Sequence, residues 1–398
     1  MRVTHLSLSE FRNYEVAEVP FKAGPNLIVG RNGQGKTNLV EAIAYFASLS
    51  SHRVSGDAAM MRAGSTTAVA RMKVAVEDRD VLLEVQLNRD KANRAQINKN
   101  AVRPRELTRW FSCVVFAPED LALVKGDPST RRRFLDEAVA ARNPVFSGVL
   151  SDYDRVVRQR TTLLKSARFK SGSGAVEATL AVWDDQLVEL GVRIIDARRS
   201  LIRALGDPLA KGYASIVEHD HLPRLSLIES VTHSIEKHGV SRETPQDPLI
   251  LATDVSRETL TAQFREALTV VRRQELDRGL TLVGPHRDDV LFELNNLPVK
   301  GYASHGESWS FALALRLSVA KLLREESPSG DPVIILDDVF AELDARRRTA
   351  LMAEVAGFEQ VIVTAAVEGD VPEGQWHRVR IEAGTVLGVD VEEVSPHV

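Results

Sequence analysis

The chain is poor in cysteine and in long apolar runs, and aromatic residues make up only 6% of it. The single cysteine, Cys113, excludes an internal disulfide framework and fits a reducing compartment. The longest unbroken apolar run is the six residues 42–47, which is too short to span a membrane. No N-terminal stretch has the pattern of a signal peptide. We therefore expect a cytoplasmic protein with no membrane contact.

The composition is that of an ordinary globular protein. Hydrophobic residues make up 44% of the 398 residues and charged residues 27%, which excludes general disorder. The 51 basic and 55 acidic residues give a formal net charge of −4. This length predicts two or three domains.

The basic residues are unevenly distributed. Residues 89–109 hold seven Lys or Arg against Asp90 and Glu106. Residues 155–170 contain six basic residues and no acid: Arg155, Arg158, Arg160, Lys165, Arg168 and Lys170. A mildly acidic protein binds a polyanion when such residues gather on one face, and the alternative is that they are solvated surfaces.

Hydrophobic periodicity predicts an α/β fold at both ends of the chain with a helical insertion between them. The N-terminal part has strands at 3–11, 26–29 and 114–116, a helix at 36–49 and an antiparallel meander at 66–100. Residues 128–209 have helical periodicity, broken at 143–144 and 171–174, and 219–255 are loop-rich. We then predict, in order, helix 257–278, strand 280–283, strand 290–294, helix 308–324, strand 333–336, helix 344–356 and strand 360–363.

A phosphate-binding loop follows the second predicted strand. Residues 30–37 match the pattern G-x-x-x-x-G-K-[ST]: Gly30, Arg31, Asn32, Gly33, Gln34, Gly35, Lys36 and Thr37. Glycines let the backbone N–H groups surround phosphate oxygens, and the helix N-terminus that follows adds positive potential. Lys36 would neutralise the β- and γ-phosphates, and Thr37 would coordinate Mg²⁺. The pattern predicts ATP and Mg²⁺ as ligands.

Two acids follow an aliphatic strand near the C-terminal end. Residues 333–336 are all aliphatic, and Asp337 and Asp338 come next. Asp337, at the carboxyl edge of a sheet, would share Mg²⁺ with Thr37. Asp338 would point towards the γ-phosphate and orient or deprotonate the attacking water. By itself such a strand is more often structural, but together with the phosphate-binding loop it predicts a site.

The two motifs lie far apart in the chain. Residues 38–332, 295 residues in all, separate Thr37 from Val333. We therefore expect both ends to fold into one ATPase head, with an N-terminal part at 1–117 and a C-terminal part at 279–398. The helical lobe, 118–278, would be inserted between them.

A third motif lies upstream of the acidic strand. Ser304, Gly306 and Glu307 have the form S-x-G-[QE] before an apolar helix, which resembles the signature of ABC ATPases. In that family the signature of one protomer closes on the nucleotide of the other, so the site is complete only in a dimer. The alternative is an ordinary helix start capped by Ser308.

The flanking segments fit the same family with one departure. Asp344 stands at the D-loop position, which would cross the dimer interface, and it would also serve as a helix N-cap. The family often has a histidine after the next strand, but residues 364–367 are Thr-Ala-Ala-Val. Hydrolysis is therefore expected to be slow.

Other stretches resemble a narrower group. Residues 8–14 together with the phosphate-binding loop are similar to SMC-type ABC ATPases. Four segments resemble the RecF family of bacterial recombination mediators: 48–53, 116–121, 129–136 and 284–289. Their roles do not follow from their chemistry, and a turn, a helix face or a helix end would account for each. Their order along the chain is what supports the resemblance.

The resemblance implies an ATP-dependent DNA clamp. Members of this family dimerise with ATP and bind gapped or single-strand/double-strand junction DNA. They act with RecR and RecO to help load RecA, and they are linked to recombinational repair, replication restart and the SOS response. A weak, DNA-stimulated ATPase activity would open the dimer. By position, Arg12 would reach the nucleotide phosphates.

DNA contacts are expected first at Arg131, Arg132 and Arg133 and in the 155–170 run, through phosphates without sequence readout. Few aromatic residues lie nearby, so a base-stacking platform is not expected. The competing interpretation pairs the three arginines with internal acids such as Asp136 and Glu137.

Three other functions remain open. A phosphotransferase acting on a small molecule would explain residues 30–37 and Asp337, but not the Ser304 segment or the insertion. A transporter ATPase subunit gives no reason for the 295-residue separation. A non-hydrolysing scaffold would fit the missing histidine. ATP turnover with and without DNA separates the clamp from the scaffold.

Overall fold

The computed structural model describes residues 1–51, 53–54, 56–77, 79–167, 174–217, 219, 221–238, 255–327 and 329–390. The chain forms two compact units. Unit 1 comprises Met1–Leu121, Pro208–Asp220 and Trp309–Val398, and unit 2 comprises Ala122–Asp207 and His221–Ser308. None of the described helices is both long and apolar enough to cross a membrane.

An antiparallel sheet forms the N-terminal part of unit 1. Its strand order is β2-β1-β4-β5-β6-β7. The strands are β1 (Arg2–Phe11), β2 (Tyr14–Pro20), β4 (Thr67–Val76), β5 (Arg79–Asn88), β6 (Arg94–Ile97) and β7 (Asn100–Val102). Alternation sets the inner face, because Val81, Leu83, Val85 and Leu87 are buried while the residues between them are not. The predicted first strand and the meander are confirmed.

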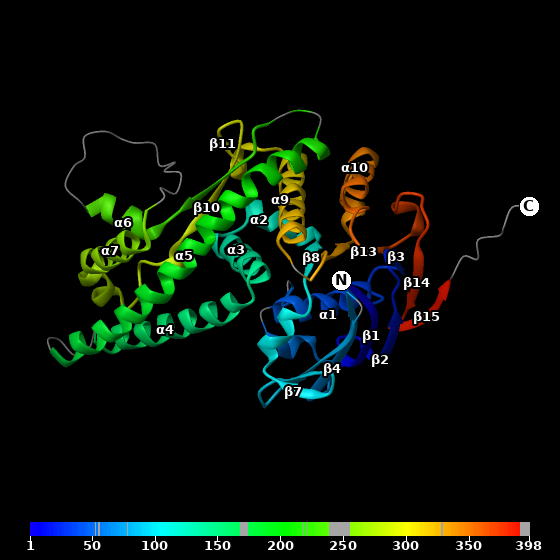
Figure 1. Cartoon of the computed structure of the whole chain (residues 1–398), viewed down its shortest axis with the longest axis horizontal. Helices are drawn as coiled ribbons and strands as arrows, with labels where there is room; N and C mark the ends of the chain where they lie inside the picture. The colour runs from blue at the N-terminus through cyan, green and yellow to red at the C-terminus, as the bar shows by residue number, and fades with distance from the viewer. Residues whose placement is uncertain are drawn as a thin grey trace, which may run out of the picture. The chain divides into compact units, whose positions relative to one another are not determined.

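A second, mainly parallel sheet joins the two ends of the chain. Its order is β15-β14-β3-β13-β12-β8, so β3 lies between two strands from the C-terminal part (Figure 1). The strands are β3 (Gly24–Val29), β8 (Cys113–Phe116), β12 (Val333–Asp337), β13 (Gln360–Ala365), β14 (His377–Glu382) and β15 (Thr385–Asp390). Every residue of β12 and β13 is buried, which explains the apolar runs 333–336 and 361–363 within them. The expectation that both ends form one α/β head is confirmed.

One hydrophobic core connects these two sheets. Helix α1 (Lys36–Ser48) contributes Val40, Ile43 and Phe46 to a cluster that also contains Leu8 of β1 and Ile362 of β13. The remaining helices of unit 1 are most of α9 (His305–Glu326), α10 (Ala345–Val355) and the C-terminal end of α5 (Gly174–Ile216). The core therefore fixes the start of α1, which carries the phosphate-binding loop, against the edge of the parallel sheet.

Unit 2 is mainly helical. Its helices are most of α2 (Leu121–Lys125), α3 (Pro128–Arg142), α4 (Val145–Ala167), the N-terminal part of α5, α6 (Ser230–His238), α7 (Arg257–Arg278) and α8 (Val299–Tyr302). A small antiparallel sheet has the order β11-β10-β9, formed by β9 (Arg224–Ile228), β10 (Asp289–Leu294) and β11 (Leu297–Pro298). Tyr153, Leu187 and Phe264 lie in the hydrophobic core of unit 2.

The structure corrects several sequence-based expectations. Residues 280–283 form no strand, because the backbone N–H groups of Leu280 and Leu282 bond Glu275 instead of a neighbouring strand. Helix α5 continues past residue 209 to Ile216 with Pro208 inside it. The loop-rich segment 219–255 contains β9 and α6, whereas its residues 239–254 and the predicted break at 171–173 lie outside the described residues. The two units also divide the chain differently from the boundaries predicted at 117/118 and 278/279.

We predict that Gln360 is a polar link between the two sheets of unit 1. Its side chain is buried, accepts from Val3 N at 2.7 Å, and donates to the carbonyls of Val3 and Lys22 at 2.8 Å each. Gln360→Leu would leave these buried backbone groups unpaired, so the free energy of unfolding should fall by about 2–4 kcal/mol in urea titrations. Gln159→Leu, at an exposed position, should change it by less than about 0.5 kcal/mol. Equal effects would contradict this role.

Candidate nucleotide-binding site

The phosphate-binding loop, residues 30–37, connects β3 to α1, which begins at Lys36. Gly33 and Gly35 have φ values of 80° and 115°, a region that strains other residues. A Cβ on Gly35 would lie 2.6 Å from Tyr14 Oη, and one on Gly30 would lie 2.4 Å from Ile381 O. Backbone conformation therefore requires Gly33, space requires Gly30, and both require Gly35.

Two neighbouring segments hold the loop at Gln34. The Gln34 carbonyl accepts from Asn13 Nδ2 at 3.0 Å and from Gly384 N at 3.2 Å. The Gln34 side chain accepts from Ala383 N. The loop is thus positioned by the β1–β2 turn on one side and the β14–β15 turn on the other, which preorganises its N–H groups for an anion.

The structure brings the two distant sequence motifs together. Thr37 Oγ1 donates to Asp337 Oδ1 at 3.2 Å. Lys36 Nζ lies 3.4 Å from Arg31 O and 4.0 Å from Asp338 Oδ1, and the Lys36 side chain is only 3% exposed. A threonine hydroxyl, an ammonium and two carboxylates therefore meet at the carboxyl edge of the parallel sheet.

Thr364 is part of this arrangement. The sequence analysis predicted no role for it and noted only that its segment lacks a histidine. Its hydroxyl is buried at the end of β13, donates to Asp337 Oδ1 at 2.7 Å and accepts from Asp338 N at 2.9 Å. Asp338 itself has a φ of 50°, which turns the chain directly after β12. Thr364 thus orients both acids.

Glu119 is a second residue whose role the sequence did not reveal. It lies in the 116–121 stretch that follows β8, and β8 pairs with β12 in parallel, so Glu119 and Asp337 follow neighbouring strand ends. Burial raises the pKa of Asp337 to about 6, with further contributions from the negative charges of Asp338 and Glu119. The next residue, Asp120, is buried and pairs with Arg316 of α9 at 2.7 Å.

This excess of negative charge fits a divalent cation. Oxygen ligands from one carboxylate and one hydroxyl, completed by phosphates and water, are the environment that Mg²⁺ prefers. Among the residues that the structure describes, no group of three or more His, Cys, Asp or Glu could hold a metal by itself. Thr37 and Asp337 could therefore hold Mg²⁺ together with a nucleotide.

Arg12 is held by its own neighbours. Its Nε donates to Glu41 Oε2 at 2.8 Å and its NH1 to Ala59 O at 2.7 Å. Glu41 is fully buried and also accepts from Ser51. These contacts occupy much of the guanidinium, and a contact of Arg12 with the nucleotide remains a prediction.

The signature segment lies in unit 2 and forms the start of α9. Ser304 Oγ accepts from Glu307 N at 3.2 Å, and Glu307 Oε2 accepts from Ser304 N at 2.7 Å, which is a capping box. The helix cap is therefore Ser304, and the alternative cap at Ser308 is wrong, because Ser308 is buried inside the helix and donates to Ser304 O. In unit 1, Asp344 caps α10 by accepting from Arg347 N at 2.9 Å.

The three consecutive arginines of α3 have different environments. Arg131 is buried and forms a two-pronged ion pair with Asp289, at 2.7 and 2.9 Å. Arg132 donates to the backbone carbonyl of Asp288 at 2.8 Å, and only Arg133 is exposed. The expectation that all three contact DNA does not fit these contacts. The competing interpretation, internal pairing with an acid, holds for Arg131, whose partner is Asp289.

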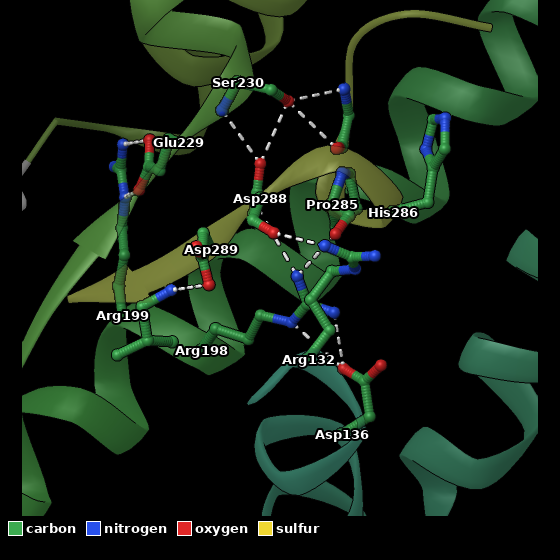
Figure 2. Close-up of polar contacts among 12 residues, drawn as sticks. Arg132, Asp136, Arg198, Arg199, Glu229, Ser230, Pro285, His286, Asp288 and Asp289 are labelled. Atoms are coloured by element: carbon green, nitrogen blue, oxygen red, sulfur yellow. Dashed lines mark hydrogen bonds and ion pairs between the residues drawn. The ribbon is translucent and has the colours of Figure 1, made fainter. Parts of the chain in front are cut away.

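Residues 284–289 and α3 build a buried polar network with α5 and α6. Arg198 of α5 donates to Asp136 Oδ1 at 2.7 Å and to Pro285 O at 2.7 Å (Figure 2). Asp288 accepts from the backbone and side chain of Ser230, at 2.9 and 3.0 Å. Two stretches with no role assigned from the sequence, 129–136 and 284–289, thus stabilise unit 2.

We predict that Asp337 destabilises the nucleotide-free protein. Its pKa is about 6 in the folded protein and near 3.8 in the unfolded chain, so its contribution to stability is lost as the pH rises from about 4 through about 6. At pH 8, Asp337→Asn should therefore raise the free energy of unfolding, by at most about 3 kcal/mol. It should also abolish the thermal shift produced by ATP with Mg²⁺. The exposed control Asp90→Asn should do neither, and a destabilised Asp337→Asn variant would contradict the prediction.

We also predict that removing the side chains of two nearby arginines changes the free energy of unfolding by very different amounts. Arg131→Ala removes a buried guanidinium and leaves the half-buried carboxylate of Asp289 without its partner, and it should cost about 3 kcal/mol in urea unfolding. Arg133→Ala removes an exposed side chain and should change stability by less than about 0.5 kcal/mol. A similar loss in both variants would show that the Arg131–Asp289 pair contributes little.

Comparisons with known proteins agree with this geometry. The RecF/RecN/SMC N-terminal domain family matches residues 2–381. The DNA replication and repair protein RecF of Leifsonia xyli subsp. xyli is 57% identical over 97% of this chain and 99% of its own. RecF of Streptomyces avermitilis is 50% identical over 94% of this chain and 95% of its own.

Solved structures show the same fold. A structure described as the recombination mediator protein RecF-ATPrS in the RecFOR pathway has a TM-score of 0.84 at 28% identity and covers 97% of each chain. An Smc head bound to the C-winged helix domain of ScpA has a TM-score of 0.52 at 16% identity, which is a likeness of fold alone. The fold is that of SMC/RecF-type ABC ATPase heads. The chain therefore belongs to the RecF/RecN/SMC N-terminal domain family and, within it, to the RecF family of DNA replication and repair proteins.

Proposed function

We propose that this protein is an ATP-dependent conformational switch on DNA. The observation that carries the proposal is the meeting of Lys36 and Thr37 with Asp337 and Asp338, although 299 residues, 38–336, separate Thr37 from Asp337. RecF relatives named for DNA replication and repair, and a RecF-ATP structure of the RecFOR pathway, support it. A head assembled from both ends of the chain can change the conformation of the segment inserted between them.

The site residues have separable roles in this proposal. The backbone N–H groups of residues 30–36 and the ammonium of Lys36 bind the phosphates of ATP. Thr37 and Asp337 would hold Mg²⁺, which when bound would neutralise negative charge on the phosphates. Asp338 accepts the proton of the attacking water, and Thr364 fixes the orientation of both acids. Because residues 364–367 contain no histidine, which many ABC ATPases have after this strand, turnover is slow.

Dimerisation would complete the site. Ser304, Gly306 and Glu307 of one protomer would approach the γ-phosphate bound by the other, and Asp344 would lie at the interface. The capping box leaves the remaining N–H groups of the first turn of α9 to bind an anion. ATP binding would thereby close the dimer, and hydrolysis would open it.

The cellular role would be that of a recombination mediator. The dimer would bind gapped or junction DNA in the cytoplasm, act with RecR and RecO, and help load RecA during gap repair, replication restart and SOS induction. A non-hydrolysing scaffold is the second candidate, because residues 364–367 contain no histidine. If ATP turnover is zero both without and with DNA, the scaffold is favoured.

Sedimentation without nucleotide, with ADP and with ATP tests the dimer. We expect dimers with ATP alone, and monomers for Lys36→Ala under all three conditions. Lys22→Ala, at an exposed position, serves as the matched control and should dimerise like the natural chain. If no condition produces dimers, a single-subunit phosphotransferase or a scaffold becomes the better explanation.

Complementation tests whether the signature acts on the nucleotide of the partner. Lys36→Ala and Ser304→Arg should each be inactive alone. Mixed in equal amounts, only the heterodimers would have an intact loop facing an intact signature, at one of their two sites, so ATP turnover should return to at most about half of the natural level. No recovery on mixing would indicate that the signature and the loop of the same chain act together, or that Ser304 serves only as a cap.

A further inference from the structure

The structure separates the basic stretches of the chain by what their side chains contact. In unit 2, Arg131 and Arg132 are held by Asp289 and Asp288. Arg160 is fully buried against Glu275, and Arg155 pairs with Asp152. Arg168 and Lys170 lie outside the described residues. Among the described residues of these stretches, three basic side chains are exposed and form no ion pair: Arg133, Arg158 and Lys165.

The stretch 89–109 in unit 1 is different. All seven of its basic side chains are exposed: Arg89, Lys91, Arg94, Lys99, Arg103, Arg105 and Arg109. Within the described part of the chain, none of the seven forms an ion pair, and the carboxylate of Glu106 accepts from a backbone N–H. By contrast, the neighbouring strands pair their charges, as Arg71 does with Glu84 and Lys73 with Asp80. We call the segment that carries them, residues 89–109, the basic hairpin.

The basic hairpin lies on the edge of the antiparallel sheet. It comprises the β5–β6 turn, β6, the β6–β7 turn, β7 and the 3-10 helix Pro104–Arg109 that follows. In the register of β6 and β7, Ala95 faces Val102, and Arg94 and Arg103 are the residues next to this pair. Of the seven basic residues only Arg94 lies within β6 and none lies within β7, so most of the charge is carried by the turns and the 3-10 helix around these strands.

The turn of the hairpin is held in a strained conformation. Asn98 and Lys99 both have positive φ values, 50° and 68°, and the turn is fixed to β5 because Leu82 N donates to Asn98 Oδ1 at 2.8 Å and Leu82 O accepts from Asn98 N at 2.8 Å. Glycine is the favoured residue in the second position of such a turn. A lysine there costs stability and presents a charge at the tip, a pattern typical of functional positions.

We propose that the basic hairpin binds the phosphate backbone of duplex DNA. This inference rests on the proposed function and assigns its DNA contacts to unit 1 instead of α3 and α4. β6 is about 13 Å long, which corresponds to roughly four base-pair steps of a duplex. The only exposed aromatic residue beside it among the described residues is Trp110, 37% exposed, so the surface offers no row of rings on which single-stranded bases would stack.

Two variants with the same change in charge test the inference. The first carries Lys91→Gln, Arg94→Gln, Arg105→Gln and Arg109→Gln, and the matched control carries Arg133→Gln, Arg155→Gln, Arg158→Gln and Lys165→Gln. Fluorescence anisotropy with a labelled gapped duplex, a continuous duplex and a single strand would be followed from 50 to 300 mM NaCl. ATP binding by both variants verifies that each is folded.

For the first variant we expect duplex affinity at 100 mM NaCl to fall about 10- to 100-fold, with the slope of log K against log salt reduced by about 3 to 4. The control should change by less than about twofold. Equal losses in both variants, a larger loss in the control, or a loss confined to the single strand would overturn the inference. So would unchanged binding with aggregation of the first variant, since edge charges would then only prevent sheet pairing. If the natural chain binds no DNA, the proposed function fails and the inference fails with it.

Lys99→Gly separates binding from folding. Glycine relieves the strained turn, so the thermal midpoint should stay the same or rise, while duplex affinity should fall about two- to fivefold as one contact is lost. Asn100→Gly, which removes no charge from the same hairpin, should leave duplex affinity unchanged. Unchanged duplex affinity in Lys99→Gly would show that the tip of the hairpin does not belong to the DNA-binding surface.

Discussion

The structure depends on the pairing of β3 with β13 on one side and β14 on the other. Parallel strands of one sheet end at a common edge, so this pairing places the phosphate-binding loop after β3 beside Asp337 after β12, one strand away across β13. In the centre of the sheet, β3 has a hydrogen-bonded strand on each side. An N-terminal fragment would lack both of these strands. The site is therefore a product of long-range strand pairing, and Gln360 strengthens it by tying the same sheet to β1.

The edge so formed concentrates negative charge. Asp337, Asp338 and Glu119 lie near one another, and Lys36 is the cation close to Asp338. Burial makes the charged form of Asp337 unfavourable, and a divalent cation bound with phosphates would remove that penalty. Nucleotide binding is thus coupled to the stability of the sheet edge, since the groups that bind the ligand are those that destabilise the protein without it. Asp120 extends this edge to α9 through Arg316.

Arginine has two distinct uses in this molecule. In unit 2, Arg131, Arg160 and Arg198 are buried in ion pairs with acids of other elements, which fixes the geometry of the groups that they join. Figure 2 shows Arg198 with Asp136. In unit 1, the arginines of the basic hairpin are exposed and unpaired among the described residues. The guanidinium group suits both, because its planar donors match a carboxylate in the interior and a phosphate at the surface.

The sequence by itself determined the elements and motifs whose signals are local. The glycines of residues 30–37, the aliphatic run before Asp337, the alternation of the meander and the helical period of α7 depend on neighbours within a few residues. Tertiary structure decided which residues became partners. Thr364 and Glu119 entered the site because their strands neighbour β12, residues 280–283 bonded to Glu275 instead of a strand, and Arg131 was buried while Arg133 was not. Such outcomes depend on contacts between residues tens to hundreds of positions apart, and periodicity along the chain carries no information about them.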